Sequence, residues 1–350
     1  MKCLFDDEAG ESCVHNIFGN CTGFCAREVK GKSVLLIDGD NSGFPNLALM
    51  KISTFYKKQG WQVYLNEAHT TVDKIYASCV FTWNKKKTIA RLQSIQAMFP
   101  DIEIEKGGYA FSPVTLPLEV DTIMPDYSLY DVDYSVGFTS RGCIRACPFC
   151  IVSKNEGTIR PVMDIYKFWN PKHKKMVLLD NNLLASPECS NVLQSLIKEK
   201  IKVDFNQGLD IRLVNDENAK LLAKVKAEVL RFSLDSPHVE KDFIKGVETL
   251  KRNGMAITKL VVYVLIGYNT TFEQDMERFK ILTGFGMAAF PMIFRDYEGN
   301  YKVRPTGNTD EIIKKCRMPI GMKLKLMKFY GILKEDKNED IYAVDVKPFF

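Results

Sequence analysis

The sequence predicts an α/β protein in which a small doubly wound parallel sheet precedes a larger series of strand–helix units. Three observations support this fold class. Short apolar runs alternate with amphipathic helical patterns along most of the 350 residues. A segment over residues 113–133 that contains Pro113, Pro117 and Pro125 divides this alternation into two series. A hydrophobic content of 46% and a charged content of 26% are those of a globular protein.

The first series covers residues 31–112 and forms the smaller predicted domain. Its strands are expected at 33–38, 61–65, 74–81 and 102–104. Pro45 opens an amphipathic helix that ends at Gly60, and a second helix covers residues 86–98. Ligands of such sheets bind at the carboxyl ends of the strands, so we expect any ligand of this domain at that edge.

The second series covers residues 134–300 and contains six predicted strands. They are expected at 134–138, 175–180, 203–207, 229–234, 259–266 and 288–294. A helix is expected near residues 162–169, and Thr270 with Glu273 forms an expected capping box later in the series. A helical extension over residues 301–350 follows the last unit.

Three cysteines directly follow the first strand of the second series. Cys143, Cys147 and Cys150 are spaced C-x3-C-x2-C. Thiolates are soft ligands that suit iron–sulfur clusters, and three of them leave one iron of a [4Fe–4S] cubane open to a substrate or cofactor. A zinc site usually shows two paired C-x2-C or C/H units, and no second pair lies near in sequence. The spacing therefore favours a cluster over zinc.

This loop resembles the signature of the radical S-adenosylmethionine (radical SAM) superfamily, with Phe149 as the aromatic residue before the third cysteine. The resemblance implies that the six strands form a partial (β/α)6 barrel with a [4Fe–4S] cluster and S-adenosylmethionine (SAM) at its mouth. In that family the open iron chelates the amino and carboxylate groups of the methionine portion of SAM. The reduced cluster then cleaves SAM to a 5′-deoxyadenosyl radical, which implies an external electron donor of the flavodoxin or ferredoxin type.

Polar residues follow several predicted strands, where the chemistry of βα barrels takes place. With the resemblance, we expect the following residues to bind SAM: Asp180, Asn181 and Asn182 in place of the family's Gly-Gly-Glu, Gln207, Asp210 and Arg212 after the next strand, Ser233 and Asp235 near the ribose and carboxylate, and Gly267 with Phe149 at the adenine. No catalytic residue that acts on the substrate is predicted.

The first domain resembles the cobalamin-binding domain of one branch of the superfamily. That domain ligates cobalt through a histidine in an Asp-x-His-x-x-Gly loop. The comparable loop here, residues 38–43, contains no histidine. We therefore expect a cobalamin-domain-like fold that does not bind cobalamin by this motif, and cobalamin-aided methyl transfer is a disfavoured alternative.

Residues 1–30 differ from the rest of the chain because they show neither helical nor strand periodicity. They contain Cys3, Cys13, Cys21 and Cys25. A segment this short cannot bury a core of its own, so an accessory metal would be its natural organiser. The alternative is a loose segment with free thiols.

Composition restricts the compartment and the partner. No run approaches the length of a membrane span and the N-terminus lacks the regions of a signal peptide, so we expect a cytoplasmic protein without membrane contact. The net charge of +5 is mild. We predict an enzyme that cleaves SAM and modifies an unidentified substrate, with a nucleobase or a peptide favoured. The alternative is a non-catalytic metal or iron–sulfur binding protein that acts on nucleic acid.

Overall fold

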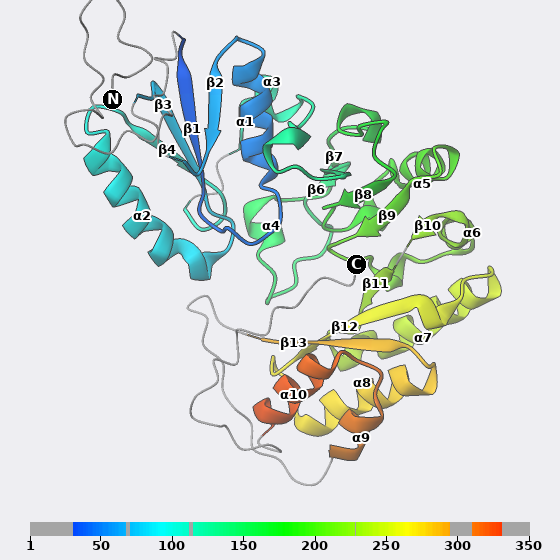
Figure 1. The fold of residues 1–350 in the computed structure, drawn as a ribbon. Coiled ribbons are helices and arrows are strands. Elements are labelled where there is room, and N and C mark those ends of the chain that lie inside the picture. Colours follow the sequence, from blue (N-terminus) through cyan, green and yellow to red (C-terminus); the bar gives the residue numbers. More distant parts are fainter. Residues whose placement is uncertain (1–30, 68–70, 112–114, 228, 295–309, 331–350) are drawn as a thin grey trace, which may run out of the picture.

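Parallel sheets dominate the computed structural model, which describes residues 31–67, 71–111, 115–227, 229–294 and 310–330. An N-terminal sheet is followed by a larger second region whose parallel strands lie in two further sheets (Figure 1). The α/β class with parallel sheets is confirmed. The four cysteines of residues 1–30 lie outside the described residues.

The N-terminal sheet has the strand order β2-β1-β3-β4, with all pairs parallel. Its strands are β1 (Ser33–Asp38), β2 (Gln62–Leu65), β3 (Lys74–Ser78) and β4 (Ile104–Gly107). Leu35 and Ile37 of β1 pack on the side of helix α2 (Lys85–Met98), and Leu36 packs on the side of α1 (Leu47–Lys57). Helices therefore cover both faces, which explains why β1 is an unbroken apolar run ending in one aspartate.

The second region contains six parallel strands at the places that the sequence predicts. They are β5 (Tyr134–Gly137), β8 (Lys175–Leu178), β9 (Lys202–Phe205), β11 (Leu230–Ser233), β12 (Leu260–Ile266) and β13 (Ala288–Ile293). One sheet has the order β10-β9-β8-β5, with the short edge strand β10 (Lys226–Ala227), and the other has the order β11-β12-β13. A parallel bridge between Leu209 and Phe232 joins the two sheets.

Helices pack on this region around one continuous apolar core. They are α5 (Cys189–Lys198), α6 (Asp216–Lys224), α7 (Glu240–Arg252), α8 (Phe272–Gly284), α9 (Asp310–Lys315) and α10 (Ile320–Phe329). The helix expected near residues 162–169 is only a 3-10 turn, Ile165–Lys167. The capping box of α8 uses Thr271 and Gln274 rather than Thr270 and Glu273, because the Thr270 hydroxyl is bonded to Asp275.

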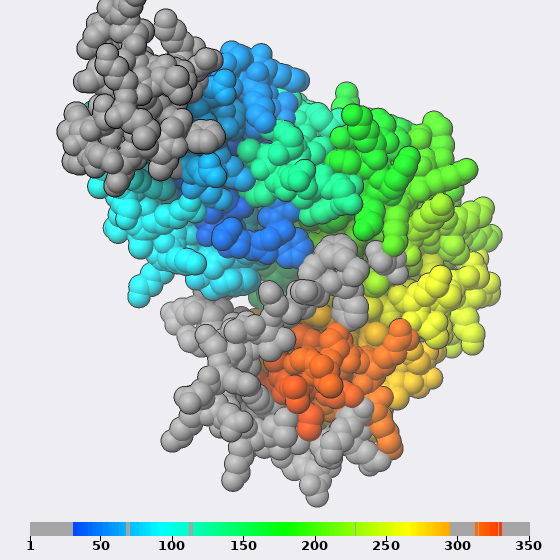
Figure 2. All heavy atoms as spheres, viewed as in Figure 1, coloured from blue at the N-terminus to red at the C-terminus, as the bar shows by residue number. Residues whose placement is uncertain are grey.

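The segment that joins the two regions is packed against both of them. It contains α3 (Leu118–Asp121), whose Asp121 carboxylate lies 2.7 Å from the ammonium of Lys51 in α1. Tyr127 is buried beside Val136 of β5, and its hydroxyl donates to the carbonyl of Phe168. Helix α1 therefore lies between the N-terminal sheet and β5, and the surface view shows the two regions in direct contact (Figure 2). No helix in the described part of the chain is long and apolar enough to cross a membrane.

Candidate functional site

The three cysteines lie on a loop that leaves the carboxyl end of β5 and is closed at its base. There, β6 (Ser140–Arg141) pairs antiparallel with β7 (Arg160–Pro161), and the short helix α4 (Val152–Asn155) follows the third cysteine. The N–H of Cys143 donates to the carbonyl of Gly157 at 3.2 Å. Gly142 has φ +80°, and a Cβ there would lie 2.2 Å from the carbonyl oxygen of Thr158. Only glycine fits this turn.

Asp180 fixes the start of the cysteine loop. Its buried carboxylate accepts hydrogen bonds from the backbone N–H groups of Thr139 and Ser140 at 3.0 and 2.6 Å, and from both hydroxyls at 2.6 Å. Burial raises the pKa of Asp180, and these four bonds oppose that shift. These four bonds show that Asp180 positions the start of the loop, and the contact with SAM expected for it stays a prediction.

Glu156, which is not among the residues expected from the sequence, holds the other side of the loop. Its carboxylate, 6% exposed, accepts from the N–H of Gly142 at 2.9 Å, from Arg141 at 3.2 Å and from the amide of Asn181 at 2.8 Å. The hydroxyl of Tyr109, which follows β4 of the N-terminal sheet, donates to the same carboxylate. Burial and this carboxylate raise the pKa of the phenol.

Asn182 places an unpaired acceptor beside the first cysteine. Its Nδ2 lies 3.4 Å from Sγ of Cys143. Its Oδ1 is buried, and it is the one buried side-chain oxygen or nitrogen in the described residues without a hydrogen-bond partner. Buried polar atoms are nearly always bonded, so this oxygen fits a donor that the protein itself does not supply. The ammonium of an amino acid is such a donor.

Asp210 links the cysteine loop to the end of β9. Its carboxylate lies 2.9 Å from Nε of Arg145, which stands between the first two cysteines, and 2.6 Å from Nε of Arg212. Burial raises the pKa of Asp210, but the two guanidiniums outweigh burial and leave it below its usual range. Burial also raises the pKa of the Cys147 thiol, and the positive charge of Arg212 opposes that rise.

Asp235, which follows β11, interacts electrostatically with the cysteines. Its charge acts on the thiols of Cys147 and Cys150, whose pKa values are raised chiefly by burial. Burial raises the pKa of Asp235 itself, and Ser233 with the backbone at Leu265 opposes that shift. These interactions bring the expected residues after β11 to the same place as the cysteine loop.

An aromatic cluster joins the third cysteine to the ends of β12 and β13. The ring of Phe149 meets Tyr268 edge to face at 5.4 Å, and Tyr268 meets Phe294 at 4.7 Å. Gly267, at φ +79°, precedes this tyrosine. The structure thus brings together the two expected adenine contacts, Phe149 and the Gly267 segment, whereas Gln207 is exposed at the end of β9.

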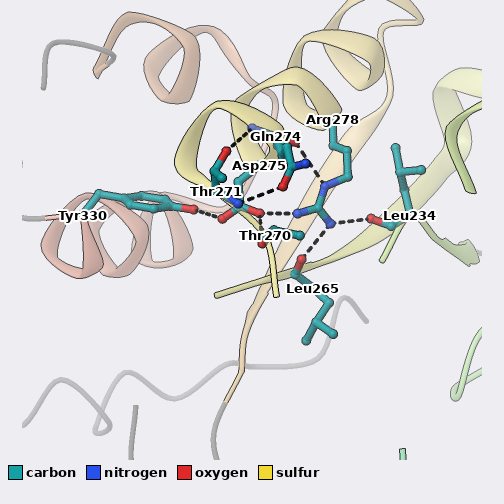
Figure 3. A network of polar contacts seen from close by, with 8 residues as sticks. All are labelled: Leu234, Leu265, Thr270, Thr271, Gln274, Asp275, Arg278 and Tyr330. Carbon is teal, nitrogen blue, oxygen red and sulfur yellow. Dashed lines mark hydrogen bonds and ion pairs between the residues drawn. The ribbon is translucent and has the colours of Figure 1, made fainter. Parts of the chain in front are cut away.

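A buried polar network holds the ends of β11 and β12 (Figure 3). The guanidinium of Arg278 in α8 donates to the carbonyls of Leu234 and Leu265 at 3.0 and 2.7 Å. It is paired with Asp275, and neither side chain is exposed. The hydroxyl of Tyr330, just after α10, donates to the same carboxylate. The strand ends that carry Asp235 and Gly267 are therefore tied to the last described helix.

No group of three His, Cys, Asp or Glu side chains in the described residues is arranged around a single ion. A cubane cluster binds each thiolate through a different iron, so its ligands do not surround one point. The three cysteines are free thiols of intermediate exposure that act electrostatically on one another. Together with the unpaired Asn182 oxygen, this donor set fits a cluster that carries a cofactor at its open iron.

This arrangement is similar in fold to a solved radical SAM methyltransferase. The chain is similar to the radical S-adenosylmethionine methyltransferase TsrM from Kitasatospora setae, whose structure has cobalamin and a [4Fe–4S] cluster bound. The TM-score is 0.56 and the identity 11%, over 75% of this chain and 72% of that chain. The resemblance expected from the cysteine loop is confirmed at the level of the fold.

A second structure, Streptococcus suis SuiB bound to S-adenosylmethionine, matches with a TM-score of 0.34 and 15% identity over 63% of this chain and 54% of that chain. No protein-family model and no curated protein sequence matches the chain.

Proposed function

We propose that this protein is a radical SAM enzyme in which Cys143, Cys147 and Cys150 hold a [4Fe–4S] cluster. The observation that carries the proposal is the buried, unpaired oxygen of Asn182 beside Cys143, on a cysteine loop anchored at the carboxyl ends of parallel strands. The fold shared with a radical SAM methyltransferase supports it. In this proposal residues 134–300 form the partial (β/α)6 barrel, and residues 31–112 form a separate Rossmann-like domain.

When bound, the cluster and SAM would supply one-electron reductive chemistry that removes a hydrogen atom from the substrate, with the electron from a flavodoxin- or ferredoxin-type donor and methionine and 5′-deoxyadenosine as products. The chain's own residues bind and orient. Oδ1 of Asn182 accepts from the SAM amino group, which satisfies the one unpaired acceptor. Asp180 and Glu156 hold the loop at its two sides.

The remaining site residues would define the cofactor pocket. Arg212, fixed by Asp210, holds positive charge near Cys147 and offers donors to the SAM carboxylate. Ser233 and Asp235 would contact the ribose, and Phe149 with the Gly267 segment would enclose the adenine. Asn181 is engaged by Glu156 and therefore supports the loop.

Cobalamin is not included in the proposal, although TsrM has it bound. The loop 38–43 offers no histidine, and its two carboxylates are engaged: Asp38 accepts from Tyr130 at 2.8 Å and Asp40 accepts from the backbone of Val80 at 2.6 Å. The proposed substrate is a nucleobase or a peptide, and the proposed compartment is the cytoplasm.

The test is anaerobic reconstitution with iron and sulfide, followed by dithionite and SAM, with 5′-deoxyadenosine measured by chromatography. The Cys147→Ala variant should lose the product. The Cys316→Ala variant removes a buried thiol that directly follows α9, and this variant should still form 5′-deoxyadenosine. A fully loaded cluster that never cleaves SAM would favour the alternative of a non-catalytic iron–sulfur protein, and failure to bind iron would overturn both.

A further inference from the structure

The carboxyl edge of the N-terminal sheet carries an aromatic pair, the exposed Trp83 and the half-buried Phe81, beside a run of lysines. Trp83 is 72% exposed, and its ring stacks on Phe81 with centroids 4.7 Å apart and planes 17° apart. Lys85, Lys86 and Lys87 form the first turn of α2, and all three are exposed. We call these five residues the Trp83 surface.

The backbone beneath the Trp83 surface is fixed. Asp40, in the loop after β1, accepts from the N–H groups of Val80 and Phe81 at 2.6 and 3.1 Å and from the amide of Asn84 at 3.1 Å. The hydroxyl of Thr88 in α2 donates to the carbonyl of Gly39 at 3.0 Å. The loops after β1 and β3 thus hold one another, and Trp83 is presented on a rigid support. The exposed ring of Trp83 is therefore held in one place, where a planar group can stack on it.

The Trp83 surface also holds positive charge that the protein does not neutralise. Residues 79–91 contain four cations and no Asp or Glu. The carboxylate of Asp40, in the adjoining loop, is bonded to the backbone of Val80 and Phe81, the amide of Asn84 and the thiol of Cys79, and its single negative charge leaves the four cations in excess. No ion pair of Lys85, Lys86 or Lys87 occurs within the described residues, and the first turn of α2 contains no acid. Cations at a helix N-terminus are disfavoured by the helix dipole, so an anionic partner relieves an unfavourable arrangement.

An exposed aromatic platform next to a basic run matches one kind of partner. Single-stranded nucleic acid offers free base faces that stack on aromatic rings and phosphates that pair with lysine. A duplex hides its base faces, and an acidic peptide satisfies the lysines without using the ring. We propose that the Trp83 surface binds single-stranded nucleic acid, with a base stacked on Trp83 and the backbone on Lys85–Lys87.

The Trp83 surface lies on the same edge of the sheet as Tyr109, which contacts the cysteine loop. Tyr109 follows β4, the neighbour of β3, and its hydroxyl bonds to Glu156. A strand bound at this edge therefore runs beside the proposed reaction site. The idea that the bound strand contains the substrate rests on the proposed function. The binding of the strand does not depend on that function.

Binding is measured on the full chain without cluster reconstitution or SAM, so its failure is distinct from failure of SAM cleavage. Anisotropy of labelled 15-mers of rU and dT gives the affinity. Trp83→Ala should weaken binding about 5- to 100-fold, the range for loss of one stacked base. The Trp83→Phe variant should bind with most of the original affinity. Unlabelled oligomer should no longer quench the protein fluorescence of this variant, because the quenched indole is that of Trp83.

The lysines are tested with a charge-matched control. Replacing Lys85, Lys86 and Lys87 by Ala should make the plot of log Kd against log salt shallower by about 2. The control replaces Lys241, Lys245 and Lys251 on the exposed face of α7 and should leave the slope unchanged.

Three outcomes would overturn the proposal. They are equal loss in the two triple variants, unchanged affinity in a folded Trp83→Ala protein, and displacement of the oligomer by an equimolar acidic peptide. Circular dichroism of each variant verifies that it is folded.

Discussion

The hydroxyl of Tyr109, beyond the last strand of the N-terminal sheet, donates a hydrogen bond to Glu156, 47 residues later in the sequence. Glu156 also accepts from Gly142, directly before the first cysteine. One side chain of the first region is therefore two hydrogen bonds away from the proposed cluster. The N-terminal domain is part of the support of the cysteine loop, and changes in it reach the site through this contact.

Replacing Tyr109 by Phe tests that coupling. A hydrogen bond to a charged acceptor is lost, so we expect the free energy of unfolding to fall by about 1.5–3 kcal/mol. We also expect less iron per chain after reconstitution, because Glu156 holds Gly142 less firmly. Tyr130→Phe is the matched control, since it removes a bond to Asp38 away from the loop. Equal iron content in both variants would contradict the coupling.

Replacing Asn182 by Ala removes the unpaired acceptor. We expect the Kd for SAM in the reconstituted protein to rise about tenfold, the effect of losing one hydrogen bond of about 1.4 kcal/mol. Iron content should change little, because the amide is not a ligand. The measurement is a titration of the cluster's electron paramagnetic resonance signal with SAM. Asn191→Ala, on the exposed side of α5, should leave the Kd unchanged, and an unchanged Kd in Asn182→Ala would refute the assigned role.

Asp126 gives a pH-dependent contribution to stability. Burial raises its pKa, but Lys57, Ser128 and Ser53 outweigh burial and leave it lowered. Because the folded-state pKa lies below the unfolded value of about 3.9, the contribution is fully present above that value and is lost as pH falls through the folded-state pKa.

Asp126→Asn should therefore cost about 1–3 kcal/mol at pH 7, and the difference from the parent protein should shrink below about pH 4. Urea unfolding at a series of pH values measures it. Asp133→Asn, at an exposed carboxylate of the same segment, is the control. A difference that persists undiminished in acid would show that packing rather than charge is responsible.

We expect replacement of Asp275 to lower the free energy of unfolding more than replacement of Tyr330, the two side chains bonded to one another beside Arg278. Asp275→Asn leaves a buried guanidinium without its counter-charge and should cost about 3–5 kcal/mol. Tyr330→Phe removes one hydrogen bond and should cost about 1–3 kcal/mol. Denaturant unfolding compares them, and equal losses would mean that the ion pair contributes no more than the phenol.

The strands β1 and β12 were predictable because each is a short buried apolar run, whereas no residue of β2 is buried and β4 contains two exposed charged residues. β1 has the bounds that the pattern predicts, and β12 starts one residue later than expected. The prediction of a helix near residues 162–169 was wrong. Ile165 and Phe168 are buried in the core, but the backbone there forms only a 3-10 turn, so buried apolar residues three apart were mistaken for a helical pattern.

The proposed site is marked in the sequence where the signal is a local spacing, as at the three cysteines, and the cluster itself stays a prediction. Asp180 and Asn182 were placed at the correct strand end, but their different roles depend on partners 40 residues away. Glu156 carried one usable signal: it is the single acid between Asp133 and Asp164, in a stretch that contains four basic residues. Tyr109, the partner of Glu156, carried no such signal, because no sequence pattern relates the end of the N-terminal sheet to a loop of the second region.

The polar network around Arg278 (Figure 3) also has a consequence for synthesis of the protein on the ribosome. The N-terminal sheet is built from residues 31–111 alone and can form early, as domains of a nascent chain do (Figure 1). The ends of β11 and β12 depend on Arg278, whose partner Asp275 receives a hydrogen bond from Tyr330. A nascent chain that ends before residue 330 thus has every strand of the first sheet but lacks one hydrogen bond of the network that holds the ends of β11 and β12.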